Sequence, residues 1–274
     1  MTEPVGRTRT SASTSAGSRV AYGKIAGTVA LVAAAVVLIM TVGVTPPDDA
    51  PASDDTRTAA PVPGAAAPTP APPAPIDRPN ASDAARLTSW AKRLARRTTI
   101  PARALVAYGR TEMWMRSEAP DCRLSWATVA GIADVASEHG TVDGGRIGRD
   151  GLATTPILGP LRDGTNGTAK VPDTDDGELD GAARWDRAVG LLQIMPERWQ
   201  RWRARAARDG EAPDPHHIDD AALTAGRILC DSKADLSTPK GWWQAVRYYR
   251  GGGDGVGFAR KVFTSADRYA TRGR

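Results

Sequence analysis

The sequence predicts an all-α domain that follows an apolar segment and a proline-rich stretch. Three observations lead to this fold class. Apolar residues recur at helical spacing in residues 81–274, residues that begin helices precede these stripes, and no segment alternates apolar and polar residues over a sustained length. Strands with one buried face show that alternation. We therefore expect helices joined by loops in this part of the chain.

One apolar run stands out before the domain. Residues 25–45 carry no charge, and about 20 residues at about 1.5 Å each cross a bilayer core of about 30 Å. Four basic residues lie in residues 1–24 and two aspartates follow the run, which predicts a cytoplasmic N-terminus and an outside C-terminus. A cleaved signal peptide is the alternative, but its apolar core is usually about 7–15 residues. We expect an uncleaved signal-anchor, and hence a single-pass membrane protein.

Residues 46–80 are roughly one-third proline. This composition predicts a disordered Pro/Ala-rich linker with polyproline II character, able to span on the order of 100 Å. Acidic and basic residues balance before residue 81, so the net charge of +5 belongs to the domain. A basic domain suits an anionic partner such as a wall polymer, nucleic acid or lipid, although so small an excess also serves solubility alone.

The first two helices of the domain are marked by a cap and a proline. Ser82 can cap the first helix. Pro101 ends it and suits the first turn of the second, which we expect to reach about Ser117. The residues expected to be buried are Leu87, Trp90, Leu94, Leu105, Tyr108 and Met113.

The remaining helices are predicted by similar signals. We expect helices over residues 125–138, from Pro196, from a cap at Asp219, from Pro239 and from about Phe258. We expect residues 141–183, rich in Gly, Asp and Pro, to form a long loop between the helix over residues 125–138 and the helix from Pro196. A loop of this length is usually functional.

Cys122 and Cys230 are the only two cysteines of the chain. An even count in a domain expected outside the cytoplasm predicts a disulfide, worth several kcal/mol for a loop of about a hundred residues. Neither cysteine has metal-ligand spacing.

Four segments of the domain carry a family resemblance. They are LSWATVAGIADVASEHG, LDGAARWDRAVGLLQIMPERW, DPHHIDDAALTAGRILC and GWWQAVRYYRGGG, in this order. With the cysteine pair in place, they resemble the actinobacterial branch of the lytic murein transglycosylases, lysozyme-like domains of the lytic transglycosylase B and SLT type. The resemblance covers nearly the whole domain.

The resemblance implies a function at the cell wall. Members cut MurNAc-GlcNAc bonds of peptidoglycan without hydrolysis and leave 1,6-anhydro ends. It implies glycan strands as the partner, attachment to the membrane through the N-terminal helix, no nucleic acid, and neither metal nor organic cofactor.

The catalytic position of the family is altered in this sequence. A glycosidic oxygen leaves readily only when it is protonated by a carboxylic acid of raised pKa in a partly apolar groove. The family uses one Glu for this step, and here Ala136 stands in its place. On a continuous helix Glu138 points about 160° away from Ala136, but a helix that turns before Gly140 could bring it into the groove. Glu138 is therefore the candidate acid.

Asp134 is the other nearby carboxylate, four residues before Glu138. If both lie in the groove, their repulsion raises one pKa, and a muramidase-type hydrolase using the pair becomes a further alternative. Otherwise Asp134 belongs to a polar helix face in water.

Candidate substrate-binding residues come from three other places. Gln193 could hydrogen-bond a sugar or satisfy loop backbone. Tyr249-Arg250 replaces the family's Tyr-Asn, and Arg250 could hold a lactyl or peptide carboxylate or lie free on the surface. Trp243, next to Trp242, is a candidate sugar platform, although a core position is common for tryptophan.

The lost Glu and Asn also favour a function of another class. A catalytically silent peptidoglycan-binding or scaffold module would bind the wall without cutting it. The aspartates at 173, 175, 176 and 180 do not fit EF-hand spacing, so we interpret them as a solvated acidic loop and expect no metal site.

Overall fold

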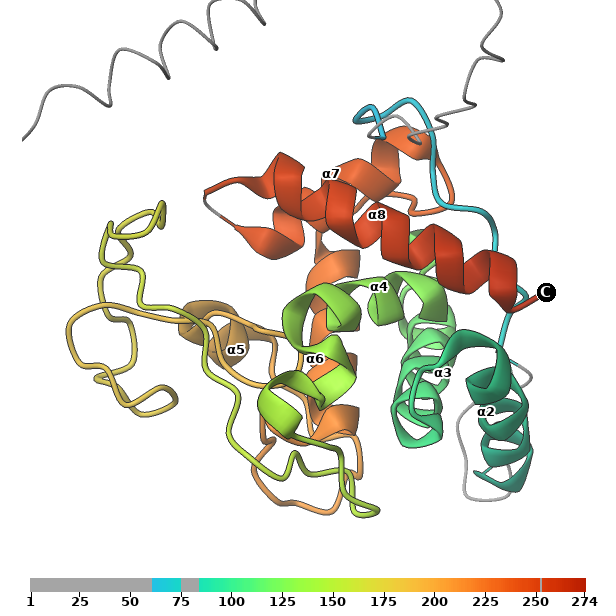
Figure 1. Cartoon of the computed structure of the whole chain (residues 1–274), viewed down its shortest axis with the longest axis horizontal. Coiled ribbons are helices and arrows are strands. Elements are labelled where there is room, and N and C mark those ends of the chain that lie inside the picture. Colours follow the sequence, from blue (N-terminus) through green and yellow to red (C-terminus); the bar gives the residue numbers. More distant parts are fainter. Residues whose placement is uncertain (1–60, 75–83, 252) are drawn as a thin grey trace, which may run out of the picture. The chain divides into compact units, whose positions relative to one another are not determined.

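The computed structural model describes residues 61–74, 84–251 and 253–274. These residues form a mostly helical domain (Figure 1). The α-helices are α2 (Ala84–Thr98), α3 (Ala102–Glu118), α4 (Trp126–Ser137), α5 (Pro196–Trp202), α6 (Ile218–Asp231), α7 (Pro239–Arg250) and α8 (Gly255–Arg272). Within the described residues, β-pairing is limited to isolated bridges. The all-α prediction is confirmed at this level.

Three helices, α4, α5 and α7, begin within one residue of the predicted starts. The Ser125 side chain accepts a hydrogen bond from the backbone N–H of Ala127, and Thr238 accepts one from Gly241. α8 begins earlier than expected because Asp254 caps it, accepting from the Gly257 N–H. Ser82 lies outside the described residues.

The predicted cap at Asp219 is wrong. α6 begins at Ile218, and His217 occupies the cap position without a side-chain bond. The Asp219 carboxylate instead accepts two hydrogen bonds, of 3.0 and 2.6 Å, from the guanidinium of Arg103. A guanidinium fork satisfies a buried carboxylate better than the single backbone donor of a cap.

The core is built where α4 packs on α8 and α3 packs on α6. The indoles of Trp126, Trp199 and Trp242 are fully buried in it. α4 and α8 approach closely at Gly131, where an added Cβ would lie 2.8 Å from the Val262 carbonyl oxygen. Any larger residue at this position would push the two helices apart.

The predicted disulfide is confirmed. Cys122, in the short 3-10 helix η3 (Pro120–Cys122), is bonded to Cys230 near the end of α6. The bond joins residues 108 positions apart, so it fastens the C-terminal end of α3 to α6.

α4 ends in a sharply turned segment. Glu138 follows Ser137 with φ of 51°, in the left-handed region, and two 3-10 turns follow, η4 (Glu138–Gly140) and η5 (Val142–Gly144). The Ser137 hydroxyl donates to the Leu191 carbonyl at 2.7 Å and accepts from the Gly140 N–H at 3.0 Å. The helix end is thereby fixed to the turn that precedes α5.

The long loop is longer than predicted. No helix lies between Gly145 and Met195 in the part of the chain that the structure describes, and this segment, yellow-green to yellow in Figure 1, extends to one side of the helices. Isolated bridges join Leu158 to Val189 and Pro172 to Trp185. The loop therefore folds back on itself as two paired arms.

The proline-rich residues 61–74 lie against the helical domain. Their carbonyl oxygens accept hydrogen bonds from two indole N–H groups, Trp126 to Pro72 at 3.0 Å and Trp243 to Ala66 at 2.8 Å. The backbone N–H of Thr69 donates to Asp267 at 2.7 Å. This part of the chain thus differs from the disordered linker expected over residues 46–80, because indole N–H groups of the helical domain find hydrogen-bond acceptors in its carbonyls.

The remaining linker residues, the basic N-terminus (residues 1–24) and the predicted anchor (residues 25–45) lie outside the described residues. Among the helices that the structure describes, none is long and apolar enough to cross a bilayer.

Candidate functional site

A groove with a volume of about 480 Å³ opens where four parts of the domain meet. They are the C-terminal end of α4, the long loop, the turn at residues 190–194 and the junction of α7 with α8. Its lining includes Ala136, Arg162, Gln193, Tyr249, Arg250 and Lys261. Three of the predicted substrate-binding residues are thus gathered around the position where the resembled family has its acid.

Gln193 reaches the groove on a tight turn. Gly190 has φ of 74°, and an added Cβ there would lie 2.0 Å from the Pro215 carbonyl, so only glycine fits. The Gln193 amide nitrogen donates to the Gly190 carbonyl at 3.0 Å. The side chain therefore satisfies loop backbone, as one interpretation of the sequence expected, while it also lines the groove.

Tyr249 and Phe258 give the groove an aromatic wall. Their rings stack with centroids 6.4 Å apart and an interplanar angle of 14°. The Tyr249 hydroxyl donates to the Leu192 carbonyl at 2.7 Å, and burial raises its pKa. Tyr249 therefore lines the groove with little exposed surface and is not a source of protons.

The groove is cationic. Its described lining carries the positive charges of Arg162, Arg250 and Lys261 against the single carboxylate of Asp254. Burial and then the neighbouring charge of Arg162 lower the pKa of Arg250, which nonetheless stays protonated because a guanidinium does not titrate near neutrality. Two guanidinium groups close together favour an anion between them.

Among these cations, Arg162 gives the clearest indication that the groove binds an anion. Its side chain comes from the long loop and is only 7% exposed. No carboxylate of the described residues pairs with it, and its guanidinium has no acceptor among them. Because this guanidinium lines the groove without an ion-pair partner, it can bind an anionic group of a ligand.

Glu138 does not line the groove. Because α4 ends at Ser137, Glu138 turns into the left-handed region and its side chain is exposed. The expected i, i+4 pair with Asp134 is not formed, since the helix stops before its second member. The predicted acid thus stands at the helix end without the apolar surroundings that an acid catalyst needs.

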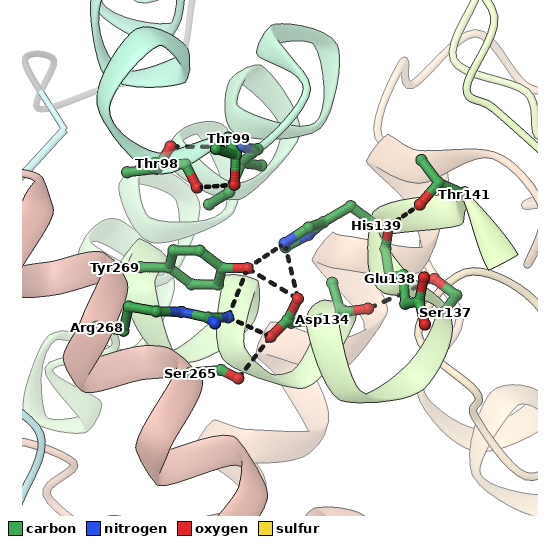
Figure 2. A network of polar contacts seen from close by, with 12 residues as sticks. Thr98, Thr99, Asp134, Ser137, Glu138, His139, Thr141, Ser265, Arg268 and Tyr269 are labelled. Carbon is green, nitrogen blue, oxygen red and sulfur yellow. Dashed lines mark hydrogen bonds and ion pairs between the residues drawn. The ribbon is translucent and has the colours of Figure 1, made fainter.

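Asp134 faces α8 instead of the groove (Figure 2). Its carboxylate accepts hydrogen bonds from Ser265 at 2.5 Å, from Arg268 at 2.7 Å and from the Tyr269 hydroxyl at 2.8 Å. Burial alone would raise its pKa, but the bonds from Ser265 and Tyr269 outweigh it and the pKa is lowered. Asp134 is therefore a structural anion.

His139 completes this network. Its two ring nitrogens lie 3.0 Å from the Tyr108 hydroxyl and 2.9 Å from the Tyr269 hydroxyl. Burial lowers its pKa to about 4, so the imidazole is neutral at pH 7. The network joins the end of α4 to α3 and α8 on the side away from the groove lining.

Trp243 is also outside the groove. Its indole is buried, stacks on Phe263 with centroids 5.7 Å apart, and lies beneath the proline-rich segment through its bond to Ala66. It packs between elements of the domain, which was the alternative to a sugar platform.

Sequence reasoning missed Arg162, Phe258 and Lys261. The lysine and phenylalanine stand three residues apart on α8, so a helical projection could have paired them. Arg162 lies in a loop without periodicity, and only the fold of the loop brings it to the groove.

The groove has side chains suited to binding an anionic sugar but lacks a suitable acid for cleaving a glycosidic bond. It offers cations, an amide and aromatic faces, which suit an anionic sugar. Asp254, its one described carboxylate, is exposed and caps α8, so it lacks the apolar setting of a general acid.

A scan of protein-family models, a search of curated proteins and a search of solved structures each find no match to this chain.

Proposed function

We propose that this protein is a catalytically silent peptidoglycan-binding module with a lysozyme-like helical domain. One observation carries the proposal. Ala136 occupies the groove at the position of the acid in the lytic transglycosylases that the sequence resembles, and Asp254 is the one carboxylate among the described lining residues. Without an acid in a partly apolar site, the glycosidic oxygen is not protonated.

The character of the groove supports a wall glycan as the ligand. Muramyl residues carry a lactyl carboxylate that is either free or extended by a peptide ending in carboxylates. Arg162 and Arg250 offer guanidinium forks for such groups, and the Tyr249–Phe258 wall offers an apolar surface to a sugar ring.

Location outside the cytoplasm is part of the proposal. The disulfide between Cys122 and Cys230 is typical of exported proteins. The apolar run at residues 25–45 suits a single-pass anchor, as argued from the sequence. Together they support a domain held at the membrane and facing the wall.

Two catalytic alternatives are less well supported. A transglycosylase needs its acid in the groove, whereas Glu138 is exposed and outside the lining. A muramidase needs two carboxylates flanking the bond, whereas Asp134 is bonded to Ser265, Arg268 and Tyr269.

The first experiment separates binding from cutting. The full chain in detergent, incubated with purified murein sacculi, should sediment with them and release no soluble muropeptide. The Glu138→Gln variant should behave identically. Release of 1,6-anhydro-muropeptides that Glu138→Gln abolishes would establish the transglycosylase instead, and products with reducing ends would establish a muramidase.

The second experiment assigns binding to the groove. Arg250→Ala and Arg162→Gln should each weaken sedimentation with sacculi by roughly tenfold or more, because each removes charged hydrogen bonds to the ligand. Arg93→Ala, an exposed arginine on α2, is the matched charge control and should bind like the wild type. Equal weakening by all three variants would mean that net charge, not the groove, holds the wall. Thermal melting checks that each variant is folded.

A further inference from the structure

Part of the acidic loop is buried where the sequence predicted solvated aspartates, although Asp176 is exposed. Asp186 is 0% exposed, Asp180 2% and Asp175 9%. They belong to the two paired arms of the long loop, which extends beside the helices in Figure 1. The bridge between Pro172 and Trp185 folds the arms together, and this pairing removes the aspartates from water.

Three of the carboxylates converge. One oxygen from each of Asp173, Asp175 and Asp186 lies within 4.8 Å of the other two. The backbone fixes this arrangement on both arms. The Asp186 N–H donates to the Val171 carbonyl at 3.0 Å, and Asp173 accepts from the N–H groups of Asp175 and Gly177 at 3.3 and 3.2 Å.

These carboxylates lack the cation that three other buried carboxylates have. Glu112 pairs with Arg116, Asp219 with Arg103 and Asp220 with Arg205. In contrast, no basic side chain within the described ranges forms an ion pair with any of the three clustered aspartates.

One oxygen in the cluster is also unsatisfied. The Oδ1 atom of Asp175 is buried and has no hydrogen-bond partner among the described residues, while its Oδ2 accepts from the Leu179 N–H at 2.9 Å. Leaving a buried carboxylate oxygen unpaired beside two others costs several kcal/mol. A bound cation would satisfy this oxygen and neutralise the cluster.

We propose that Asp173, Asp175 and Asp186 bind a divalent cation of the Ca²⁺ class. Carboxylate oxygens are the ligands that hard cations prefer, and the cluster includes no histidine or cysteine to favour zinc. Thr174 donates two hydrogen bonds to the Asp186 carboxylate, from its N–H at 3.0 Å and from its hydroxyl at 2.7 Å. Such bonds orient a metal ligand.

The cation site is connected to the groove through the backbone. The Arg162 N–H donates to the Asp186 carbonyl at 2.9 Å, and the Arg162 carbonyl accepts from Val171 at 2.8 Å. A cation on Asp186 therefore stabilises the arm that carries Arg162. The site itself lies outside the groove lining and does not depend on the proposed function.

Calorimetry and melting of the full chain in detergent test the proposal. After treatment with EDTA and its removal, titration with CaCl₂ should show one site per chain with a Kd in the micromolar to millimolar range. Free Ca²⁺ at about a hundredfold above Kd should raise the melting temperature by about 5–10 °C. If the wild type neither binds Ca²⁺ nor melts at a higher temperature with it, the proposal is overturned. A parallel titration with MgCl₂ compares the affinities of the two ions.

Matched variants assign the binding to the cluster. Asp175→Asn and Asp186→Asn should lose the Ca²⁺-dependent shift, whereas Asp176→Asn, an exposed neighbour outside the cluster, should keep it. In EDTA, Asp175→Asn should melt at the same or a higher temperature than the wild type, because one repelling charge is gone. Lower melting in EDTA, or an equal Ca²⁺ shift in all variants, would contradict the proposal and make the cluster a structural feature alone.

Discussion

Ala136 contributes a methyl group to a groove whose other side chains suit a glycan. The residues around it keep part of what an acid catalyst requires, since Tyr249 and Phe258 supply apolar surface. They also include Arg250 and Arg162, whose charges would hold a new carboxylate ionised. Ala136 and Arg250 thus act in the same direction, away from proton donation and towards anion binding.

Restoring the acid should therefore require two changes. Ala136→Glu alone should give weak release of 1,6-anhydro-muropeptides from sacculi, because an adjacent cation lowers a carboxyl pKa by about 1–3 units. At saturating sacculi, where the weaker binding does not matter, adding Arg250→Asn should increase the rate by at least about tenfold, since each unit changes the protonated fraction about tenfold.

The corresponding glutamine variants are the control for that prediction. Ala136→Gln, with or without Arg250→Asn, fills the same space without a titratable proton and should release nothing. Product from the glutamine variants would refute a role for the introduced acid. If the variant with both Ala136→Glu and Arg250→Asn binds sacculi without cutting them, the groove lacks further groups that the reaction needs.

At the scale of elements, hydrogen bonds of Asp134 and His139 to α3 and α8 fix the end of α4. His139 links Tyr108 of α3 to Tyr269 of α8, and Figure 2 shows its contact with Tyr269. Its ring remains neutral because burial disfavours the charged form. Protonation would place a second cation beside Arg268, so this junction is sensitive to acid.

The network predicts a pH-dependent stability. The folded-state pKa of His139 is about 4, below the value of about 6.5 for an unfolded chain. Between these values the unfolded chain binds a proton that the folded chain does not. The contribution is fully present above pH 6.5 and is lost as the pH falls towards 4, with a slope of up to about 1.4 kcal/mol per pH unit.

Urea unfolding across that window measures the effect. His139→Asn removes the titrating ring, and asparagine tolerates the left-handed backbone of φ 58° at this position. The variant should be less stable at pH 7, and its free energy of unfolding should fall less steeply between pH 6.5 and 4. His216 also has a lowered pKa from burial and is present in both proteins, so it cancels. Parallel curves would exclude His139 as the source.

Some elements could be predicted from the sequence because a local signal specifies each of them. Ser125, Thr238 and the prolines mark helix starts through backbone groups only a few residues away. Gln193, Tyr249 and Arg250, which the sequence resemblance to lytic transglycosylases singled out, all line the groove. Arg162 and Asp186 reach their positions through the pairing of two loop arms, which no periodic pattern encodes. The same is true of Trp243, whose place depends on carbonyls more than 170 positions earlier in the sequence.

At the scale of the whole molecule, one covalent bond spans most of these features. The disulfide closes a segment that contains α4, the long loop with its acidic cluster, the turn at Gln193 and α5. The groove opens between α4 and the α7–α8 junction, and neither cysteine lines it. The bond therefore constrains the chain that carries the site without shaping the site.

Its contribution should be large for stability and small for binding. Closing a loop of 108 residues restricts the unfolded ensemble by roughly 4–5 kcal/mol, which corresponds to a fall in melting temperature of roughly 8–20 °C on reduction for a domain of this size. The variant with Cys122→Ala and Cys230→Ala should melt at the same low temperature with or without dithiothreitol, which separates the bond from other effects of the reductant. Because the constraint acts on the unfolded chain, the reduced protein should still sediment with sacculi well below its new melting temperature. If the reduced protein remains folded but loses binding, the bond positions α4 at the groove. The disulfide would then act on the native structure and not on the unfolded ensemble.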